Sequence, residues 1–280
     1  MEINTPIEFR PYPLYPVYPP YHKGLYLEDY FIDYWTKNNF ETDREFIAIS
    51  WTSYYNNGMN RSRLQSYLDS LPKDKKYFTV CQHDDAPSEL LPPNTLIFSA
   101  GGNVISDNII PIPLICSSLE LNGNTSTRSY LASFVGSMTH PIRSRMIQHL
   151  TGNSNFYLQY GEWKNTIDNS RLQSFIDVSL NSIFMLCPRG YGATSFRLYE
   201  SFQLGCIPVY ISDRFYLPFA DKINWEKLCI FITPDEIPNI ENRLKSISET
   251  EIADMLTYGK SIYEDFLTLD KTCLNIIKRI

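Results

Sequence analysis

The sequence predicts an α/β fold made of two domains with a cleft between them. Short apolar runs typical of buried strands alternate with stretches of helical period, and this alternation occurs twice along the chain. A polar, turn-rich segment, L-N-G-N-T-S-T at residues 121–127, separates the two blocks. Strands that alternate with helices form parallel sheets, so each block is expected to build one such sheet with right-handed crossovers. The domains are therefore placed at residues 1–125 and 126–280.

The first block opens with an extended arm and continues with short elements. Residues 6–21 are dense in Pro and Tyr, which disfavours a helix and indicates a segment packed on the protein's own surface. A disordered ligand for another protein is the alternative for this arm. The periodicity after it predicts two helices, at residues 26–38 and 61–71, and four strands, at residues 46–50, 77–81, 96–99 and 109–115.

The second block follows the same alternation with clearer boundaries. Pro141 stands where the first turn of a helix tolerates proline, and Gly205 stands where a helix ends. We predict helices at residues 141–150, 171–180 and 194–204, further helical segments within 235–279, and strands at residues 131–135, 156–159, 183–187, 207–211 and 228–232.

Composition and charge exclude several classes of protein. The 280 residues are 43% hydrophobic and carry a net charge of −6, with no run rich in Lys or Arg. This balance excludes disorder and argues against a nucleic-acid partner. No apolar run reaches the ~18 residues of a transmembrane helix, and no secretory signal is evident. The six cysteines include no C-x-x-C pair, so we expect buried thiols and a cytoplasmic, reducing location.

The segment C-P-R-G-Y-G-A-T-S-F-R-L-Y-E, residues 187–200, carries the densest chemical signal. It describes a buried strand, a glycine loop and a helix start, which together suit an anion such as a phosphate. Thr194 or Ser195 is expected to cap that helix, and Arg189 and Arg197 add positive charge. The alternative is a plain crossover helix with a surface ion pair between Arg197 and Glu200. A G-x-G-x-x-G fingerprint is absent, which disfavours an oxidoreductase.

This segment, together with the motifs around it, resembles the exostosin-like glycosyltransferases, carbohydrate-active family 47. G-C-I-P-V, S-D, L-P-F and N-W follow it, and A-S-F-V-G and H-P-I-R precede it, so the resemblance covers roughly residues 128–235. Compact members of this kind are similar to those encoded by large algal viruses, which would place the protein in the host cytoplasm. The resemblance implies a GT-B architecture of two Rossmann-like domains and inverting transfer from a nucleoside diphosphate sugar.

Carried over by motif, the resemblance also implies donor-binding roles. The residues lining the diphosphate or donor sugar would be Arg189, Tyr191, Ser195 and Arg197, while Glu200 would contact the ribose. Arg143 is a further candidate phosphate ligand, with a surface salt bridge as its alternative. UDP and GDP remain open as the nucleotide, and xylose, galactose, arabinose and glucuronic acid remain open as the sugar.

Transfer also needs a base for the acceptor hydroxyl, and the first domain offers one candidate segment. His83, Asp84 and Asp85 follow a predicted buried strand, at the edge where open α/β sheets bind ligands. An acidic turn is the alternative interpretation, and Glu28 and Asp29 are weaker candidates for the base. No Asp-x-Asp pair occurs, so we expect neither a metal ion nor any other cofactor.

Several aromatic residues allow two interpretations. Trp51, Tyr54 and Tyr55 are candidates for stacking on an acceptor sugar or for core packing, whereas Trp163 and Trp225 are expected in the core or at a hinge. The apolar end of the chain is expected to form a helix that crosses back to the first domain. Taken together, the sequence predicts a glycosyltransferase that acts on a glycan acceptor, with a non-catalytic sugar-nucleotide or glycan-binding module as the alternative.

Overall fold

The computed structural model describes residues 3–11, 25–38, 40–58, 60–85, 87–115, 118–119, 128–164, 167 and 169–280. The chain divides into two compact units. Unit 1 comprises Met1–Ser117, Leu217–Phe219 and Thr268–Ile280, and unit 2 comprises Ser118–Tyr216 and Ala220–Leu267. The expected linker at residues 121–127 and the tyrosines of the Pro/Tyr arm lie outside the described residues.

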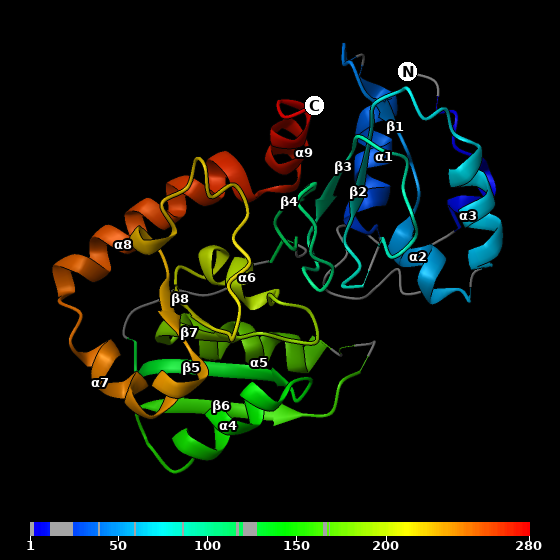
Figure 1. Ribbon diagram of the computed structural model, residues 1–280. Helices are drawn as coiled ribbons and strands as arrows, with labels where there is room; N and C mark the ends of the chain where they lie inside the picture. Colours follow the sequence, from blue (N-terminus) through cyan, green and yellow to red (C-terminus); the bar gives the residue numbers. More distant parts are fainter. Residues whose placement is uncertain are drawn as a thin grey trace. The chain divides into compact units, whose positions relative to one another are not determined.

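Unit 1 contains a parallel sheet whose strands follow one another in sequence order (Figure 1). Its strands are β1 (Glu45–Phe46), β2 (Tyr77–Cys81), β3 (Thr95–Ser99) and β4 (Ile109–Pro111). The last strand is shorter than predicted because Pro111 and Pro113 have no N–H group to continue the ladder. The first strand is also shorter, since only two of its residues pair with β2.

Helices cover both faces of this sheet, and each face has its own core. On one face α1 (Leu27–Lys37) brings Phe31 and Trp35 against Phe46 and Phe78. On the other face, α3 (Arg61–Ser70) packs against a cluster that includes Phe9, which is 1% exposed. The α9 helix (Leu269–Ile277) belongs to this unit and contacts α1, and a short α2 helix (Trp51–Asn56) forms where the sequence predicts none.

Unit 2 contains a five-stranded parallel sheet in the order β6-β5-β7-β8-β9. The strands are β5 (Tyr130–Ser137), β6 (Phe156–Gly161), β7 (Ser182–Pro188), β8 (Ile207–Ile211) and β9 (Ile230–Ile232). The chain moves from β5 to β6 in one direction and then returns to the other side of β5 to form β7. Right-handed crossovers therefore place helices on both faces, and the α/β class with two parallel sheets is confirmed.

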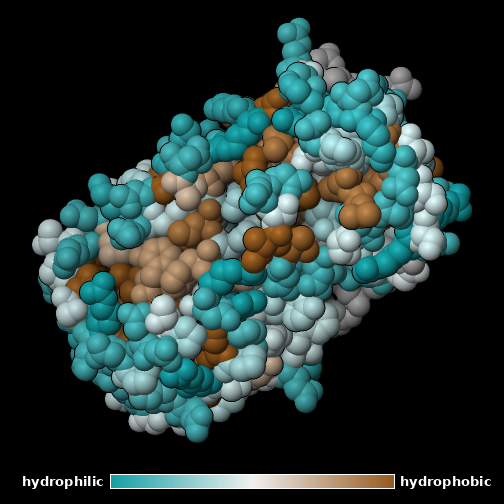
Figure 2. All heavy atoms as spheres, viewed as in Figure 1, coloured by the Kyte–Doolittle hydropathy of each residue, from teal (hydrophilic) through white to brown (hydrophobic). Residues whose placement is uncertain are grey.

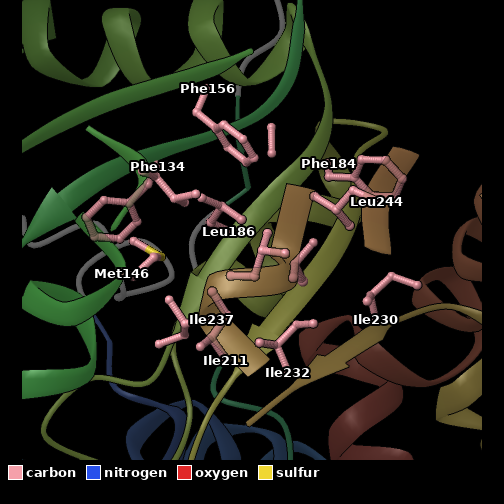
Figure 3. Packing of buried hydrophobic residues seen from close by; sticks show 14 of the residues in the cluster. Phe134, Met146, Phe156, Phe184, Leu186, Ile211, Ile230, Ile232, Ile237 and Leu244 are labelled. Atoms are coloured by element: carbon pink, nitrogen blue, oxygen red, sulfur yellow. The ribbon is translucent and has the colours of Figure 1, made fainter. Parts of the chain in front are cut away.

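The main core of unit 2 lies on the face covered by α4 (Pro141–Leu150), η3 (Pro234–Asn239) and α7 (Ile240–Lys245). Alternate strand residues enter this core, as a period of two requires. Figure 3 shows Met146 of α4 against Phe134 of β5. The helices α5 (Asn169–Leu180) and α6 (Arg197–Gln203) contact β7 outside this cluster, and α8 (Glu249–Ile262) packs against α6 and β8.

The polarity of the surface and the state of the cysteines agree with what the composition predicts. On the face shown in Figure 2, hydrophilic residues cover most of the surface and hydrophobic residues form separate patches. Among the described residues, no helix is long and apolar enough to cross a bilayer. The buried free thiols that the sequence predicts are confirmed at Cys81, Cys187, Cys206, Cys229 and Cys273.

Candidate functional site

The strand order of unit 2 creates a switch point between β5 and β7. The connections from these two strands run to opposite sides, and open α/β sheets bind ligands outside the carboxyl ends of the strands at such a point. The loop after β5 leads into α4, and residues 189–196 after β7 lead into α6. The predicted donor-binding residues of unit 2 lie on these two connections and helices.

Arg143 joins the carboxyl ends of both strands. Its Nη1 donates to the carbonyl of Ser137 at 2.6 Å, its Nη2 to that of Pro188 at 3.2 Å, and its Nε to that of Arg189 at 2.9 Å. The side chain is buried, at 4% exposure. The alternative of a surface salt bridge is therefore wrong, because the guanidinium is buried and bonds backbone carbonyls at the ends of both strands.

Arg189 folds back over its own loop. Its Nε donates to the carbonyl of Gly192 at 3.1 Å and its Nη2 to that of Tyr191 at 3.2 Å. Its Nη1 forms an ion pair of 2.6 Å with Oδ1 of Asp213, which follows β8. In the sequence Asp213 stands out only within the S-D motif, because residues 24 positions apart show no pairing signal in a single sequence.

Arg197 opens α6 and reaches back to β5. Its Nε donates to the carbonyl of Val135 at 2.7 Å, its Nη2 also bonds this carbonyl, and its guanidinium carbon lies 5.1 Å from the ring centroid of Phe134. This packing requires a glycine at position 136. A Cβ there would lie 2.3 Å from Nη2 of Arg197 and 2.6 Å from its Cζ. The structural role of Gly136 is therefore to leave room for the guanidinium.

The start of α6 differs from the expected cap. Phe196 is the N-cap, and no side chain caps the helix, so the predicted capping by Thr194 or Ser195 is wrong. Ser195 is 4% exposed, and its Oγ has no hydrogen-bond partner. Burial raises the pKa of Glu200 above its usual value, and the charge of Arg197 opposes that rise. Gly205 follows the helix with φ of 62°, as the predicted helix end requires.

The remaining groups at this edge are an imidazole and exposed aromatic rings. His140 is the N-cap of α4, and its side chain accepts the amide of Ile142. Tyr191 is 61% exposed. Trp163 is 53% exposed, which excludes the core, one of its two predicted positions, whereas Trp225 is buried.

In unit 1 the predicted base residues lie directly after β2. The Nδ1 of His83 accepts the amide of Asp85 at 3.1 Å, and Oδ1 of Asp85 accepts from Nδ2 of Asn103 at 3.0 Å. Burial lowers the pKa of His83. A neutral imidazole that accepts at Nδ1 carries its proton on Nε2, so in this arrangement neither nitrogen is a free base. The geometry therefore favours the two aspartates over His83.

The structure gives Glu28 a structural role, whereas the sequence suggests it as a weaker candidate for the base. Its side chain is wholly buried, its Oε1 accepts the amide of Thr52 at 2.5 Å, and its Oε2 accepts that of Gln82 at 3.0 Å. The carboxyl thus ties α1 to the start of α2 and the end of β2. Burial, and then the neighbouring Asp29, raise the pKa of Glu28 to about 7.

The structure also decides between core packing and sugar stacking for the aromatic residues after β1. Trp51 is 0% exposed, and its Nε1 donates to Oγ1 of Thr79 at 2.8 Å. Tyr54 is buried as well, so neither ring can stack on a sugar. Tyr55 is half-buried, with its ring centroid 4.9 Å from that of His83. Among the described residues, no group of three or more His, Cys, Asp or Glu could hold a metal ion.

Residues 94–247, more than half of the chain, match the family described as the exostosin GT47 domain. The chain belongs to this family. The match includes the whole Arg143, Arg189 and Arg197 arrangement, and it begins at β3 of unit 1. Family membership thus confirms the resemblance and extends it beyond residues 128–235 in both directions.

Curated relatives are plant proteins. A probable glycosyltransferase of Arabidopsis thaliana is 31% identical over 46% of this chain and 24% of its own length. The probable glucuronosyltransferase 47 A of Physcomitrium patens is 29% identical over 74% of this chain and 49% of its own length. A probable glucuronosyltransferase of Oryza sativa subsp. japonica is 47% identical over 24% of this chain and 16% of its own length. The chain thus spans half or less of these exostosin relatives.

Two solved structures are similar at low identity. The crystal structure of TarM matches with a TM-score of 0.39 and 9% identity, covering 76% of this chain and 57% of that chain. The pneumococcal O-GlcNAc transferase GtfA, in complex with UDP and GlcNAc, matches with a TM-score of 0.38 and 13% identity, covering 72% and 44%.

Proposed function

We propose that this exostosin-family chain is an inverting GT-B glycosyltransferase that moves a sugar from a nucleoside diphosphate sugar to a hydroxyl of a glycan. The observation that carries this proposal is the convergence of Arg143, Arg189 and Arg197 on the carboxyl ends of β5 and β7. Guanidinium groups at a switch-point crevice suit a diphosphate, which needs positive charge as it leaves.

In this proposal Arg143 has a structural role, whereas Arg189 and Arg197 bind the diphosphate. Arg143 holds the site together, because its side chain is buried and bonds the carbonyls at the carboxyl ends of both strands. A guanidinium has five N–H donors, so Arg189 and Arg197 keep donors beyond those in the bonds described above. The buried Oγ of Ser195 adds a hydroxyl whose hydrogen-bonding capacity is unused, and such groups usually have partners.

The reaction itself needs one proton acceptor and one leaving group. The acceptor oxygen forms a bond to the anomeric carbon while the bond from that carbon to the diphosphate oxygen breaks. The electron pair of the broken bond leaves with the nucleoside diphosphate, and the hydroxyl proton passes to the base. Attack opposite the leaving group inverts the anomeric centre. We assign the base to Asp84 or Asp85 in unit 1, as the sequence predicts.

The names of the relatives suggest which donor sugars to test first. Two of the relatives above carry glucuronosyltransferase names, so glucuronic acid joins xylose among the first sugars to test. Both UDP and GDP forms should be compared. A panel of sugar nucleotides, titrated while thermal unfolding is followed, should reveal the donor, because a ligand that binds only the folded state raises its stability.

Slow hydrolysis of that donor distinguishes an enzyme from a binding module. A transferase is expected to release free nucleotide from its donor even without acceptor, whereas a binding module would be stabilised by the donor without consuming it. The proposal fails if no sugar nucleotide raises the unfolding temperature, and it reduces to the module if binding occurs without hydrolysis or transfer.

A further prediction is that transfer does not depend on a metal ion. Arginine side chains supply the positive charge that a divalent cation supplies in other transferases. Activity in EDTA should therefore stay close to that of the untreated protein, measured as nucleotide release. Loss of activity in EDTA, with recovery on adding Mn²⁺ or Mg²⁺, would contradict this part of the mechanism and would point to Asp84 and Asp85 as metal ligands.

A further inference from the structure

The ion pair between Arg189 and Asp213 places a carboxylate on a guanidinium that the proposed function assigns to the diphosphate. The Nη1 to Oδ1 distance is 2.6 Å. The two side chains differ in exposure, at 10% for Arg189 and 51% for Asp213. The carboxylate therefore lies on the open side of the pair, where an incoming anion would approach.

The carboxyl of Asp213 is charged at neutral pH. Burial raises its pKa, but the hydrogen bond and the charge of Arg189 outweigh this effect and hold the pKa below its usual value. His140 also interacts electrostatically with Asp213, Arg189 and Arg143, and its own pKa is lowered, first by burial. The imidazole is accordingly neutral at this pH and does not cancel the negative charge of Asp213.

We propose that Asp213 is a specificity-determining residue that weakens the binding of the nucleoside diphosphate product relative to the nucleoside diphosphate sugar. This inference rests on the proposed function. It assigns to the carboxylate a task that the arginines cannot perform, because three guanidinium groups alone would favour the more highly charged ligand.

The discrimination follows from the charges of the two ligands. A sugar-linked diphosphate carries two negative charges, whereas the free nucleoside diphosphate gains a third when its terminal phosphate ionises with a pKa near ~6. Repulsion between like charges grows with the product of the charges and falls with distance and screening. A fixed carboxylate beside the diphosphate therefore disfavours the product more than the donor and speeds product release.

The Asp213→Asn variant separates charge from shape. Asn keeps an oxygen that can accept from Nη1 of Arg189, so the loop after β7 should keep its structure. Asp177→Asn is the matched control, because Asp177 is an exposed carboxylate on α5 that accepts from Gln173 at 2.8 Å. It lies near the end of α5 that leads into the start of β7, at the other edge of the sheet from the arginines.

Binding of UDP, GDP, inorganic pyrophosphate and UDP-glucuronic acid should be measured by calorimetry for wild type and both variants. We expect Asp213→Asn to bind UDP or GDP, and pyrophosphate, about tenfold more tightly, with a smaller gain for the sugar nucleotide. In turnover, inhibition by the free nucleoside diphosphate should strengthen by the same factor. Asp177→Asn should match wild type in every measurement.

Three results would overturn the inference: equal affinities in wild type and Asp213→Asn, equal gains for product and donor, or uniform weakening of all ligands. The last would mark Asp213 as a residue that only maintains the loop, and thermal unfolding would show it as a loss of stability. If wild type binds no nucleoside diphosphate and releases none from any sugar nucleotide, the proposed function itself fails. If wild type binds and turns over while Asp213→Asn gains nothing, only the role of Asp213 fails.

Discussion

Arg197 combines a charge that a diphosphate needs with hydrogen bonds that hold its own position. Its Nε and Nη2 both bond the carbonyl of Val135, so the guanidinium is fixed before any ligand arrives. Arg197→Ala should lower donor affinity and turnover together, by ~10²-fold or more if the contact strengthens in the transition state. Steady-state kinetics with the donor identified by titration measures this effect.

Arg197→Lys provides the control for charge. Lys keeps one positive charge but cannot donate two bonds to one carbonyl in the geometry of a planar fork, so we expect it to recover only part of the loss. Wild-type kinetics in an Arg197→Ala protein whose thermal unfolding is unchanged would exclude this residue from the site.

At the level of single residues, the sequence identifies charge and spacing but not hydrogen-bond partners. It proposes Arg143, Arg189 and Arg197 as ligands of an anion, but it cannot show that backbone carbonyls of β5, β7 and the following loop occupy much of each guanidinium. It also leaves Trp163 open between the core and a hinge, and Trp51 open between core packing and stacking on a sugar. Exposures of 53% and 0% settle these two cases in opposite ways.

At the carboxyl end of β5, the absence of a side chain at Gly136 leaves room for the guanidinium of Arg197 on α6. A Cβ at position 136 would meet the guanidinium of Arg197 and lie 2.9 Å from the ring of Phe134. Gly136→Ala should therefore displace Arg197 and reduce donor affinity about tenfold or more, along with some loss of stability from overpacking. Calorimetry with the nucleoside diphosphate measures the affinity, and thermal unfolding measures the stability.

Gly161→Ala is the matched control on the neighbouring strand. Gly161 pairs with Ser137 at the same edge, and a Cβ there would only come within 3.8 Å of Nη2 of Arg171. We expect near wild-type affinity from this variant. Equal effects of the two substitutions would mean that Gly136 matters for strand geometry in general and not for the position of Arg197.

Glu28 connects three elements of unit 1, and its pKa of about 7 makes this connection dependent on pH. A carboxyl whose folded pKa lies above the unfolded value of 4.5 binds its proton more tightly in the folded state. Its contribution to the free energy of unfolding is therefore fully present at low pH and declines as pH rises from about 4.5 to about 7. The full decline is on the order of 3 kcal/mol.

Glu28→Gln should remove this decline. Relative to the variant, wild type should lose stability between pH 4.5 and pH 7 in denaturant titrations repeated across that window. Asp29, whose pKa burial raises to about 6, neighbours Glu28, so part of the difference within the same pH window comes from the change in Asp29 when the charge at position 28 is removed. A stability difference that is constant with pH would show that Glu28 keeps an ordinary pKa in the folded protein.

Elements with a strong internal pattern are predictable, and elements created by tertiary contacts are not. The helix Pro141–Leu150 has the predicted bounds because proline and apolar spacing define it locally. The sequence predicts no helix at α2, because six residues are too few to define a period, although Trp51, Tyr54 and Tyr55 stand at helical spacing. Its first turn forms where the buried carboxyl of Glu28 accepts the amide of Thr52, and Glu28 lies 24 residues earlier.

At the scale of the whole molecule, the sequence predicts two parallel α/β sheets, and both are present. It also predicts that the final helix returns to the first domain, and α9 belongs to unit 1, where Oη of Tyr30 donates to Oδ1 of Asp270 at 2.5 Å. In the proposed function the donor would bind the arginines of unit 2, and the base would come from unit 1.

If unit 2 binds the donor and unit 1 supplies the base, variants in the two units should have different effects. Variants in unit 2 should lose donor binding, whereas neutral substitutions in the loop after β2 should leave donor binding intact and slow transfer. Among Asp84→Asn, Asp85→Asn and His83→Gln, one variant should bind the donor normally and transfer ~10²–10⁴-fold more slowly, the range typical for loss of a general base. We expect it to be one of the two aspartates, because an aspartate is ionised at neutral pH, while both nitrogens of His83 are engaged or protonated.

The measurement compares nucleotide affinity by calorimetry with transfer to a glycan acceptor, and Asp107→Asn, in the loop after β3, serves as the matched acidic control. If all three variants transfer at near wild-type rates, the base lies elsewhere in the chain. Glu28 cannot then replace them, because its side chain is fully buried and both of its oxygens accept backbone amides, so Asp29 would be the next residue to substitute.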